Sequence, residues 1–135
     1  PGVDAGTIMK AAATDMDRAL AAAKFSKQIY RKAAENFVEE YRRSAGEPSP
    51  SLGHWVGMAT HDVGPHKGPL KPGMVFTIEP ALRVPEEKIY VRLEDLVVIT
   101  EKGRDVLSDF VPRDIASIER IMKEEGILER YPRVD

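Results

Sequence analysis

The histidines of this chain are confined to one short stretch: His54, His61 and His66 are the only three among its 135 residues. Histidine is the side chain most often used for metal binding and for proton transfer near neutral pH. His66 lies in a Gly-Pro-His-Lys-Gly turn, where we expect a solvated side chain. The stretch therefore offers His54 and His61 as candidate metal ligands or proton-transfer groups.

Two glutamates have unusually apolar neighbours. Glu79 ends the run Val-Phe-Thr-Ile-Glu, and Glu94 lies within Val-Arg-Leu-Glu. An isolated carboxylate in such surroundings is costly unless it is paired or bound to a cation. Side chains alternate along a strand with a period of two, so Thr77 shares a face with Glu79, and Arg92 shares a face with Glu94. If the two strands pair, both glutamates converge on one point.

One histidine and two carboxylates form a ligand set that suits a hard or borderline divalent ion such as Mn²⁺, Co²⁺ or Zn²⁺. The alternative interpretation needs no metal: Glu94 pairs with a basic residue such as Arg92, and Glu79 lies at an exposed strand end. The residue types alone favour neither interpretation.

The first third of the chain has the pattern of two helices. Apolar residues recur at helical spacing over residues 8–23, after Asp4 as a candidate N-cap, and again over residues 29–41. A break is expected near residues 25–26. Segment 44–51 holds two prolines and a glycine, which predicts a loop.

The rest of the chain changes to a strand pattern and then returns to helix. Short β-branched and aromatic runs predict strands, over residues 74–78, 89–93, 96–100 and 105–107. A last helix is expected to begin near residues 112–114 and to reach Met122, with Gly126 as its C′ residue. Two helices, then strands, then a helix predict an α+β fold in one domain.

Composition excludes several classes of protein. The apolar content is 42%, the charged content 31% and the net charge −2, so no strong field is present to attract nucleic acid or an anionic membrane. The absence of cysteine excludes disulfides and thiolate metal sites. No apolar run approaches the roughly 20 residues of a membrane span. We expect a cytoplasmic protein, and the start at Pro1, without an initiator methionine, suggests a piece of a longer chain.

Three segments, read together, resemble the signatures of one enzyme family. They are LGHWVGMATHDVG, LKPGMVFTIEPAL and VRLEDLVVITEKG, in this order and closely spaced. They are similar to the pita-bread-fold metallopeptidases (the creatinase/aminopeptidase superfamily), and most similar to the Xaa-Pro aminopeptidases. The resemblance implies half of a pita-bread fold. Residues 1–135 would be a single domain, the C-terminal half of the catalytic domain, with residues 1–44 helical, 45–110 a loop and strands with the ligand motifs, and 111–135 a C-terminal helix and tail.

The resemblance also implies roles for the candidate residues. In such enzymes two metal ions about 3.5–4 Å apart activate a water that attacks the peptide carbonyl. His54, Glu79 and Glu94 resemble metal ligands, with Glu79 also the general base and Glu94 the carboxylate that bridges both ions. His61 resembles a catalytic histidine that contacts the substrate, and Arg92 an arginine that braces the site. Mn²⁺ is the first expectation, with Co²⁺ and Zn²⁺ as alternatives, and the implied substrate is a peptide with proline at its second position.

The sequence also departs from the family pattern. Pro1-Gly2-Val3 resembles a Pro-Gly-hydrophobic step of the family. The two aspartate ligands that precede this step in the family have no counterpart here, since Asp15 and Asp17 lie in a predicted helix. At most one ion is therefore expected in this chain alone, which we expect to be inactive. Pro50 stands where the family often has a substrate-contacting histidine. Smaller departures are Ala81, Tyr90 and Leu96.

Three functional hypotheses follow from this pattern. The chain is part of a dinuclear aminopeptidase; or it is a self-associating module, in which a homodimer covers the face that the other half of the fold would meet; or it is a non-catalytic relative that keeps only the fold.

Overall fold

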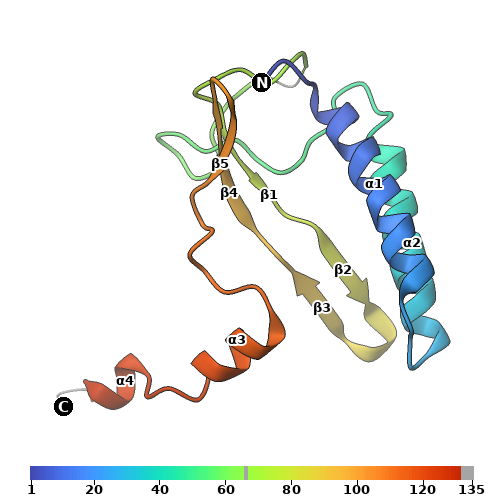
Figure 1. The fold of residues 1–135 in the computed structure, drawn as a ribbon, viewed down its shortest axis with the longest axis vertical. Coiled ribbons are helices and arrows are strands. Elements are labelled where there is room, and N and C mark those ends of the chain that lie inside the picture. Colours follow the sequence, from blue (N-terminus) through green and yellow to red (C-terminus); the bar gives the residue numbers. More distant parts are fainter. Residues whose placement is uncertain (66, 132–135) are drawn as a thin grey trace.

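A computed structural model describes residues 1–65 and 67–131, so His66 and residues 132–135 lie outside the described structure. Two long helices open the fold. Helix α1 is Ala5–Ala22 and helix α2 is Gln28–Ser44. Asp4 caps α1 as predicted, because its Oδ1 accepts a hydrogen bond of 2.9 Å from the Thr7 amide. The two helices run side by side along one flank of the strands (Figure 1).

Five short strands follow the helix pair. They are β1 (Val75–Ile78), β2 (Ala81–Val84), β3 (Ile89–Arg92), β4 (Asp95–Thr100) and β5 (Gly103–Val106). All pairings are antiparallel, with the order β1-β4-β5 in one sheet and β2-β3 in the other. The ribbon in Figure 1 shows β1 leading into β2, and β3 leading back into β4, as one long two-stranded arm. The predicted α+β class is confirmed.

The long arm keeps a single register through a local interruption. Val75 pairs with Val98 in β1–β4, and Ala81 pairs with Arg92 in β2–β3. The two strand pairs therefore share one antiparallel register. Continuing this register across the gap places Glu79 opposite Glu94. Proline has no amide hydrogen to donate to a strand ladder, which accounts for the interruption beside Glu79 at Pro80.

The main core lies between the three-stranded sheet and the loop before it. Leu70, Phe76, Val97 and Ile99 form its buried cluster. Trp55 packs edge-on against Phe76, with ring centroids 5.5 Å apart. This apolar contact fixes the segment that carries His54 against β1.

A second contact attaches the helix pair to the far end of the arm. Helix α2 contacts β2, and the helix pair buries Met9, Ala13, Ala34 and Val38. At the N-terminal end of α2, Lys27 and Tyr30 both bond to Glu87, in the 3₁₀ turn Pro85–Glu87 that joins β2 to β3.

The structure corrects three predictions. The predicted strand 89–93 ends at Arg92, so Glu94 lies in the gap between β3 and β4 rather than inside a strand. Strand β2 was not predicted. Gly126 is not the C′ residue of a long helix: α3 (Ile115–Ile121) ends earlier, and Gly126 is the N-cap of the short helix α4 (Ile127–Arg130). The Gly126 backbone is extended, at φ −75° and ψ 163°, and its amide donates to Glu129 Oε2 at 2.7 Å.

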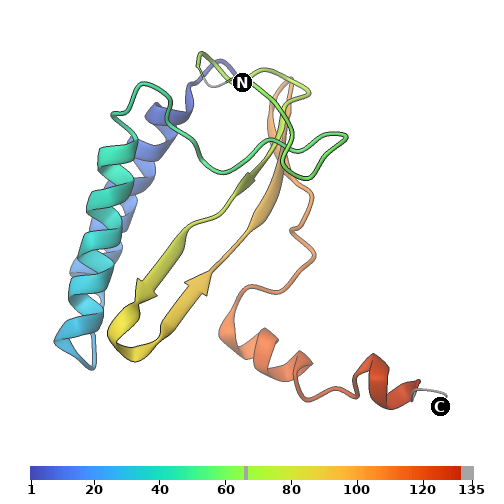
Figure 2. The same ribbon diagram turned by 180° about the vertical axis from the view of Figure 1, so that it is seen from behind.

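The C-terminal arm, residues 107–131, leads away from the rest of the molecule. Figures 1 and 2 show α3 and α4 on the side of the strands opposite to α1 and α2. Within residues 1–65 and 67–131, no helix is long and apolar enough to cross a membrane.

Candidate metal centre

The backbone around His54 lies along the edge of β1. The Thr77 amide donates to the His54 carbonyl oxygen at 2.9 Å, and the Val56 amide donates to the Val75 carbonyl oxygen at 3.0 Å. The approach is close enough that a Cβ on Gly53 would lie 2.3 Å from the Thr77 carbonyl oxygen. A glycine directly before His54 is therefore what allows this histidine to reach the sheet.

The His54 ring has a defined orientation. Its Nδ1 lies 3.0 Å from the Trp55 carbonyl oxygen. A carbonyl oxygen only accepts, so Nδ1 must carry the proton in this contact. The lone pair of Nε2 then remains for a ligand, and Nε2 lies 3.5 Å from Glu79 Oε1. A ligand histidine whose other nitrogen is held by a carbonyl is the usual arrangement in metal sites.

The Glu79 side chain is largely enclosed, with 18% of its surface exposed. The Thr77 hydroxyl donates to Glu79 Oε1, and Arg92 Nη1 donates to Glu79 Oε2 at 3.1 Å. Thr77 is itself buried and also accepts a 2.9 Å bond from the His54 amide, so one hydroxyl ties the backbone of His54 to the carboxylate of Glu79.

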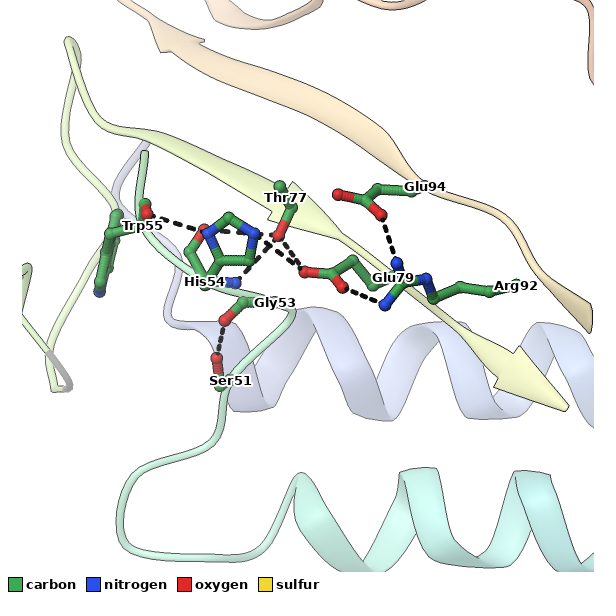
Figure 3. Close-up of polar contacts among 8 residues, drawn as sticks. All are labelled: Ser51, Gly53, His54, Trp55, Thr77, Glu79, Arg92 and Glu94. Carbon is green, nitrogen blue, oxygen red and sulfur yellow. Dashed lines mark hydrogen bonds and ion pairs between the residues drawn. The ribbon is translucent and has the colours of Figure 1, made fainter. Parts of the chain in front are cut away.

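Glu94 faces the same point from the opposite side of the arm. Arg92 Nη2 lies 3.2 Å from Glu94 Oε2, so this guanidinium bonds to both glutamates (Figure 3). The Glu94 side chain is 41% exposed, which leaves it freer to adjust than Glu79. Of the metal-free alternative, the pairing of Glu94 with Arg92 is present, but Glu79 is not exposed.

The three candidate ligands form one cluster. Nitrogen and carboxylate oxygens of His54, Glu79 and Glu94 lie within 4.8 Å of one another. Ligand atoms at about 2.0–2.2 Å from one ion in a tetrahedral arrangement lie roughly 3.3–3.6 Å apart, so the three side chains would have to move closer by about 1 Å to hold an ion. One imidazole and two carboxylates fit a hard or borderline divalent ion. Among the described residues, this is the group of acidic and histidine side chains that satisfies such a fit.

His61 lies against the cluster rather than within it. Its ring and that of His54 have centroids 4.0 Å apart and planes inclined by 43°. The His61 side chain is exposed to solvent. It is therefore placed beside the candidate ligands on the open side, where an incoming molecule would meet it.

The chain immediately after Glu94 is also anchored. Asp95 accepts from the Ser108 hydroxyl at 2.7 Å and from Arg113 Nη1 at 2.6 Å. The Ser108 hydroxyl, and then Arg113, lower the pKa of the Asp95 carboxyl below its usual range. These bonds attach Ser108 and Arg113, on the C-terminal arm, to Asp95, the residue directly after Glu94.

Other sequence candidates lie elsewhere. Asp15 and Asp17 lie on α1, as predicted, and pair with Arg18 and Arg42. Tyr90 is exposed on β3, and His66 falls outside the described residues. Sequence reasoning assigned no role to Thr77. Its position two residues before Glu79, on one strand face, is the signal that could have identified it.

Comparisons with known proteins find similar sequences and similar folds. Residues 2–101 match metallopeptidase family M24. A Xaa-Pro aminopeptidase from Haemophilus influenzae is 40% identical over 83 residues, which cover 53% of this chain and 19% of that protein. The solved structure of proline aminopeptidase P II from Yersinia pestis is similar, with a TM-score of 0.60 and 30% identity, over 90% of this chain and 30% of that chain.

A zinc-substituted aminopeptidase P from Escherichia coli, solved in complex with product, is similar with a TM-score of 0.52 and 29% identity. That similarity covers 87% of this chain and 27% of the other. This chain thus spans less than a fifth of the curated relative and less than a third of either solved chain.

Proposed function

This chain belongs to metallopeptidase family M24, and we propose that residues 1–135 are the C-terminal half of the catalytic domain of a metal-dependent aminopeptidase of the Xaa-Pro type. The convergence of His54, Glu79 and Glu94 on one point is the observation that carries the proposal. The names of the relatives support the reaction class, and the aminopeptidase P structures support the fold.

His54, Glu79 and Glu94 would hold a divalent ion, with Mn²⁺ as the first candidate and Co²⁺ or Zn²⁺ as alternatives. The ion supplies Lewis acidity and lowers the pKa of a bound water. The three residues would provide the ligands for one ion. The two-ion site that the family resemblance implies needs two further aspartates, and we propose that they come from outside residues 1–135.

The side chains around the ligands have separate tasks in this proposal. Glu79 is the general base, because its carboxylate is enclosed and held by Thr77 and Arg92 in a fixed orientation. Arg92 positions Glu79 and Glu94 relative to each other by bonding to both. His61, exposed beside His54, donates a hydrogen bond to the oxygen of the scissile carbonyl as negative charge develops on it.

The proposed substrate is a peptide whose second residue is proline, bound by its free amino terminus near the ligand cluster. With one ion and three ligands, we expect the isolated chain to bind such a peptide but to cleave it slowly or not at all. Binding is therefore the appropriate test of substrate class.

Paramagnetic broadening would test that binding directly. A peptide with proline at position two is mixed with the chain and Mn²⁺, and peptide proton linewidths are recorded. We expect broadening that is strongest at the first residue and is lost in His54→Ala. An N-acetylated peptide and a peptide with alanine at position two are matched controls. Equal broadening of all three peptides, or broadening that survives His54→Ala, would count against the proposal.

The C-terminal arm supports a second part of the proposal, a homodimer through the exposed half-domain face. Large apolar side chains on it are open to solvent, among them Phe110 at 87%, Ile115 at 76% and Met122 at 78% exposed. Several exposed large apolar side chains on one short segment favour association. Light scattering at micromolar concentrations should give twice the chain mass, and a Phe110→Asp, Ile115→Asp variant should give the monomer mass. A wild-type chain that stays monomeric across this range would refute the dimer.

The alternative function is that of a non-catalytic relative that keeps the fold. The approach of three ligand atoms to one another favours the metal-binding proposal over it. Failure of the wild-type chain to bind any of the three ions would reverse that preference.

A further inference from the structure

Residues 56–63, here called the histidine loop, present His61 to the candidate metal centre. The loop is closed at its base by an antiparallel bridge between Trp55 and Asp62, where the Asp62 amide donates to the Trp55 carbonyl oxygen at 2.9 Å. Trp55 is in turn bridged to Phe76 on β1. The base of the loop is therefore continuous with β1, the strand that ends directly before Glu79.

The carboxylate of Asp62 holds the turn of the loop from inside. Its Oδ1 accepts from the Val63 amide at 2.8 Å, and its Oδ2 accepts from the Ala59 amide at 3.3 Å. Gly57 lies so close that a Cβ there would be 2.2 Å from Asp62 Oδ2. One side chain thus contacts the backbone on both arms of the loop, directly next to His61.

Little else packs against the loop. Residues 57–61 are exposed, and Met58 and Val63 have 104% and 93% of their surface open. Apolar burial therefore cannot hold the turn, and its shape depends on polar contacts: those to Asp62 and one backbone bond of 3.2 Å from the Gly57 amide to the Ala59 carbonyl oxygen. The backbone amides of Val63 and Ala59 also lower the pKa of the Asp62 carboxyl below its usual range, which is consistent with an ionised acceptor.

We infer that Asp62 is a positioning residue whose carboxylate fixes the histidine loop and thereby holds the His61 ring against His54. Only the use of His61 in catalysis rests on the proposed function. The role of Asp62 in holding the His61 ring against His54 is independent of it. The side-chain hydrogen bonds of Asp62 within the described residues go to the loop backbone and not to the candidate ligands, so we expect it to act through His61.

The test uses the whole chain and the spectroscopic signature of its histidine rings. Nuclear Overhauser contacts between the His54 and His61 rings, and hydrogen exchange at the Ala59 and Val63 amides, are measured by NMR in wild type, Asp62→Ala and Asp62→Asn. We expect Asp62→Ala to lose the ring contact and to exchange both amides about tenfold faster. Asp62→Asn keeps an acceptor for Val63 and should restore the contact in part.

Asp105→Ala, which removes an exposed carboxylate on β5, is the matched control and should behave as wild type. If Asp62→Ala keeps the ring contact and the exchange rates of wild type, the inference is wrong. If Asp62→Ala does not fold, Gly57→Ala decides the question, because its methyl group displaces the same carboxylate. Loss of the ring contact in Gly57→Ala supports the inference, and its retention overturns it.

A Mn²⁺ titration separates this inference from the proposed function. The three candidate ligands are unchanged in Asp62→Ala, so we expect its affinity for Mn²⁺ to remain within a few-fold of wild type. A wild-type chain that binds no ion would contradict the proposed function. The Overhauser contact between the His54 and His61 rings would still decide the role of Asp62.

Discussion

Glu79 and Glu94 stand opposite each other in the register of the long antiparallel arm, in the interruption where neither residue belongs to a strand. Two carboxylates directly opposed across a ribbon repel each other. In this structure one guanidinium, that of Arg92, bonds to both. The two carboxylates therefore create a site that attracts positive charge. The Arg92 guanidinium supplies that charge in this structure, and a divalent ion would be attracted to the same site.

Replacing Arg92 by methionine keeps the aliphatic stem and removes the charge. The opposed carboxylates of Glu79 and Glu94 then lose the positive charge that pairs with both. We expect the metal-free chain to lose about 1 kcal/mol of stability, a modest value because the partners are partly exposed. Mn²⁺ should bind more tightly, since the guanidinium no longer repels it, and should raise the melting temperature further than in wild type.

Thermal unfolding with and without Mn²⁺ measures both effects. Arg83→Met is the matched control, because Arg83 lies over the Tyr90 ring on the neighbouring strands and bonds to neither glutamate. An Arg92→Met variant with wild-type stability and a wild-type metal response would show that Arg92 does not offset the repulsion.

Gly53 and Gly103 make a matched pair for testing how His54 reaches the sheet. A Cβ at Gly53 would lie 2.3 Å from a backbone oxygen of Thr77, whereas a Cβ at Gly103 would meet nothing within 4 Å. We expect Gly53→Ala to lose about 1–3 kcal/mol in urea unfolding, as overpacked positions do, and to lose metal affinity as well. Gly103→Ala should remain near wild type. Equal stability of the two variants would mean that the segment before His54 does not approach β1 so closely.

Much of this centre could be predicted from the sequence. The alternation of side chains along strands placed Thr77 beside Glu79 and Arg92 beside Glu94, and the apolar surroundings of the glutamates suggested that they converge. The structure confirms the convergence. Local patterns were sufficient here because β1 leads into β2 and β3 leads into β4, so the two antiparallel pairs share one register.

Other features depended on contacts that local patterns do not contain. The role of Thr77 requires knowing that the segment of His54 lies along β1, more than twenty residues away. The end of the strand at Arg92 follows from Pro80 on the opposite strand, not from Leu93 itself. Gly126 was read as a helix end because glycine is common there, but its extended backbone begins a new helix instead.

The contact between α2 and the β2–β3 turn gives a pH-dependent prediction. Hydrogen bonds from Lys27 and then Tyr30 lower the pKa of Glu87 below its ordinary value of 4.5. A group whose pKa is lowered by folding stabilises the fold above its unfolded pKa, and this contribution is lost as the pH falls through the folded value. We therefore expect Glu87→Gln to melt at a lower temperature than wild type at pH 7.

The same difference in melting temperature should shrink as the pH falls below 4.5 and disappear once Glu87 is protonated in the folded wild type. Glu86→Gln, on the same turn but exposed, is the control and should match wild type at every pH. A Glu87→Gln deficit that persists undiminished in acid would contradict the role of its ionised carboxylate.

Calorimetric titration of Mn²⁺ into the wild-type chain and into His54→Ala tests the central claim most directly. His54 supplies the only nitrogen ligand in the cluster within the described residues, and its Nδ1 bond to the Trp55 carbonyl leaves Nε2 for the ion. We predict one ion bound per wild-type chain and an affinity at least tenfold weaker in His54→Ala. No binding by wild type, or equal binding by the two chains, would contradict it.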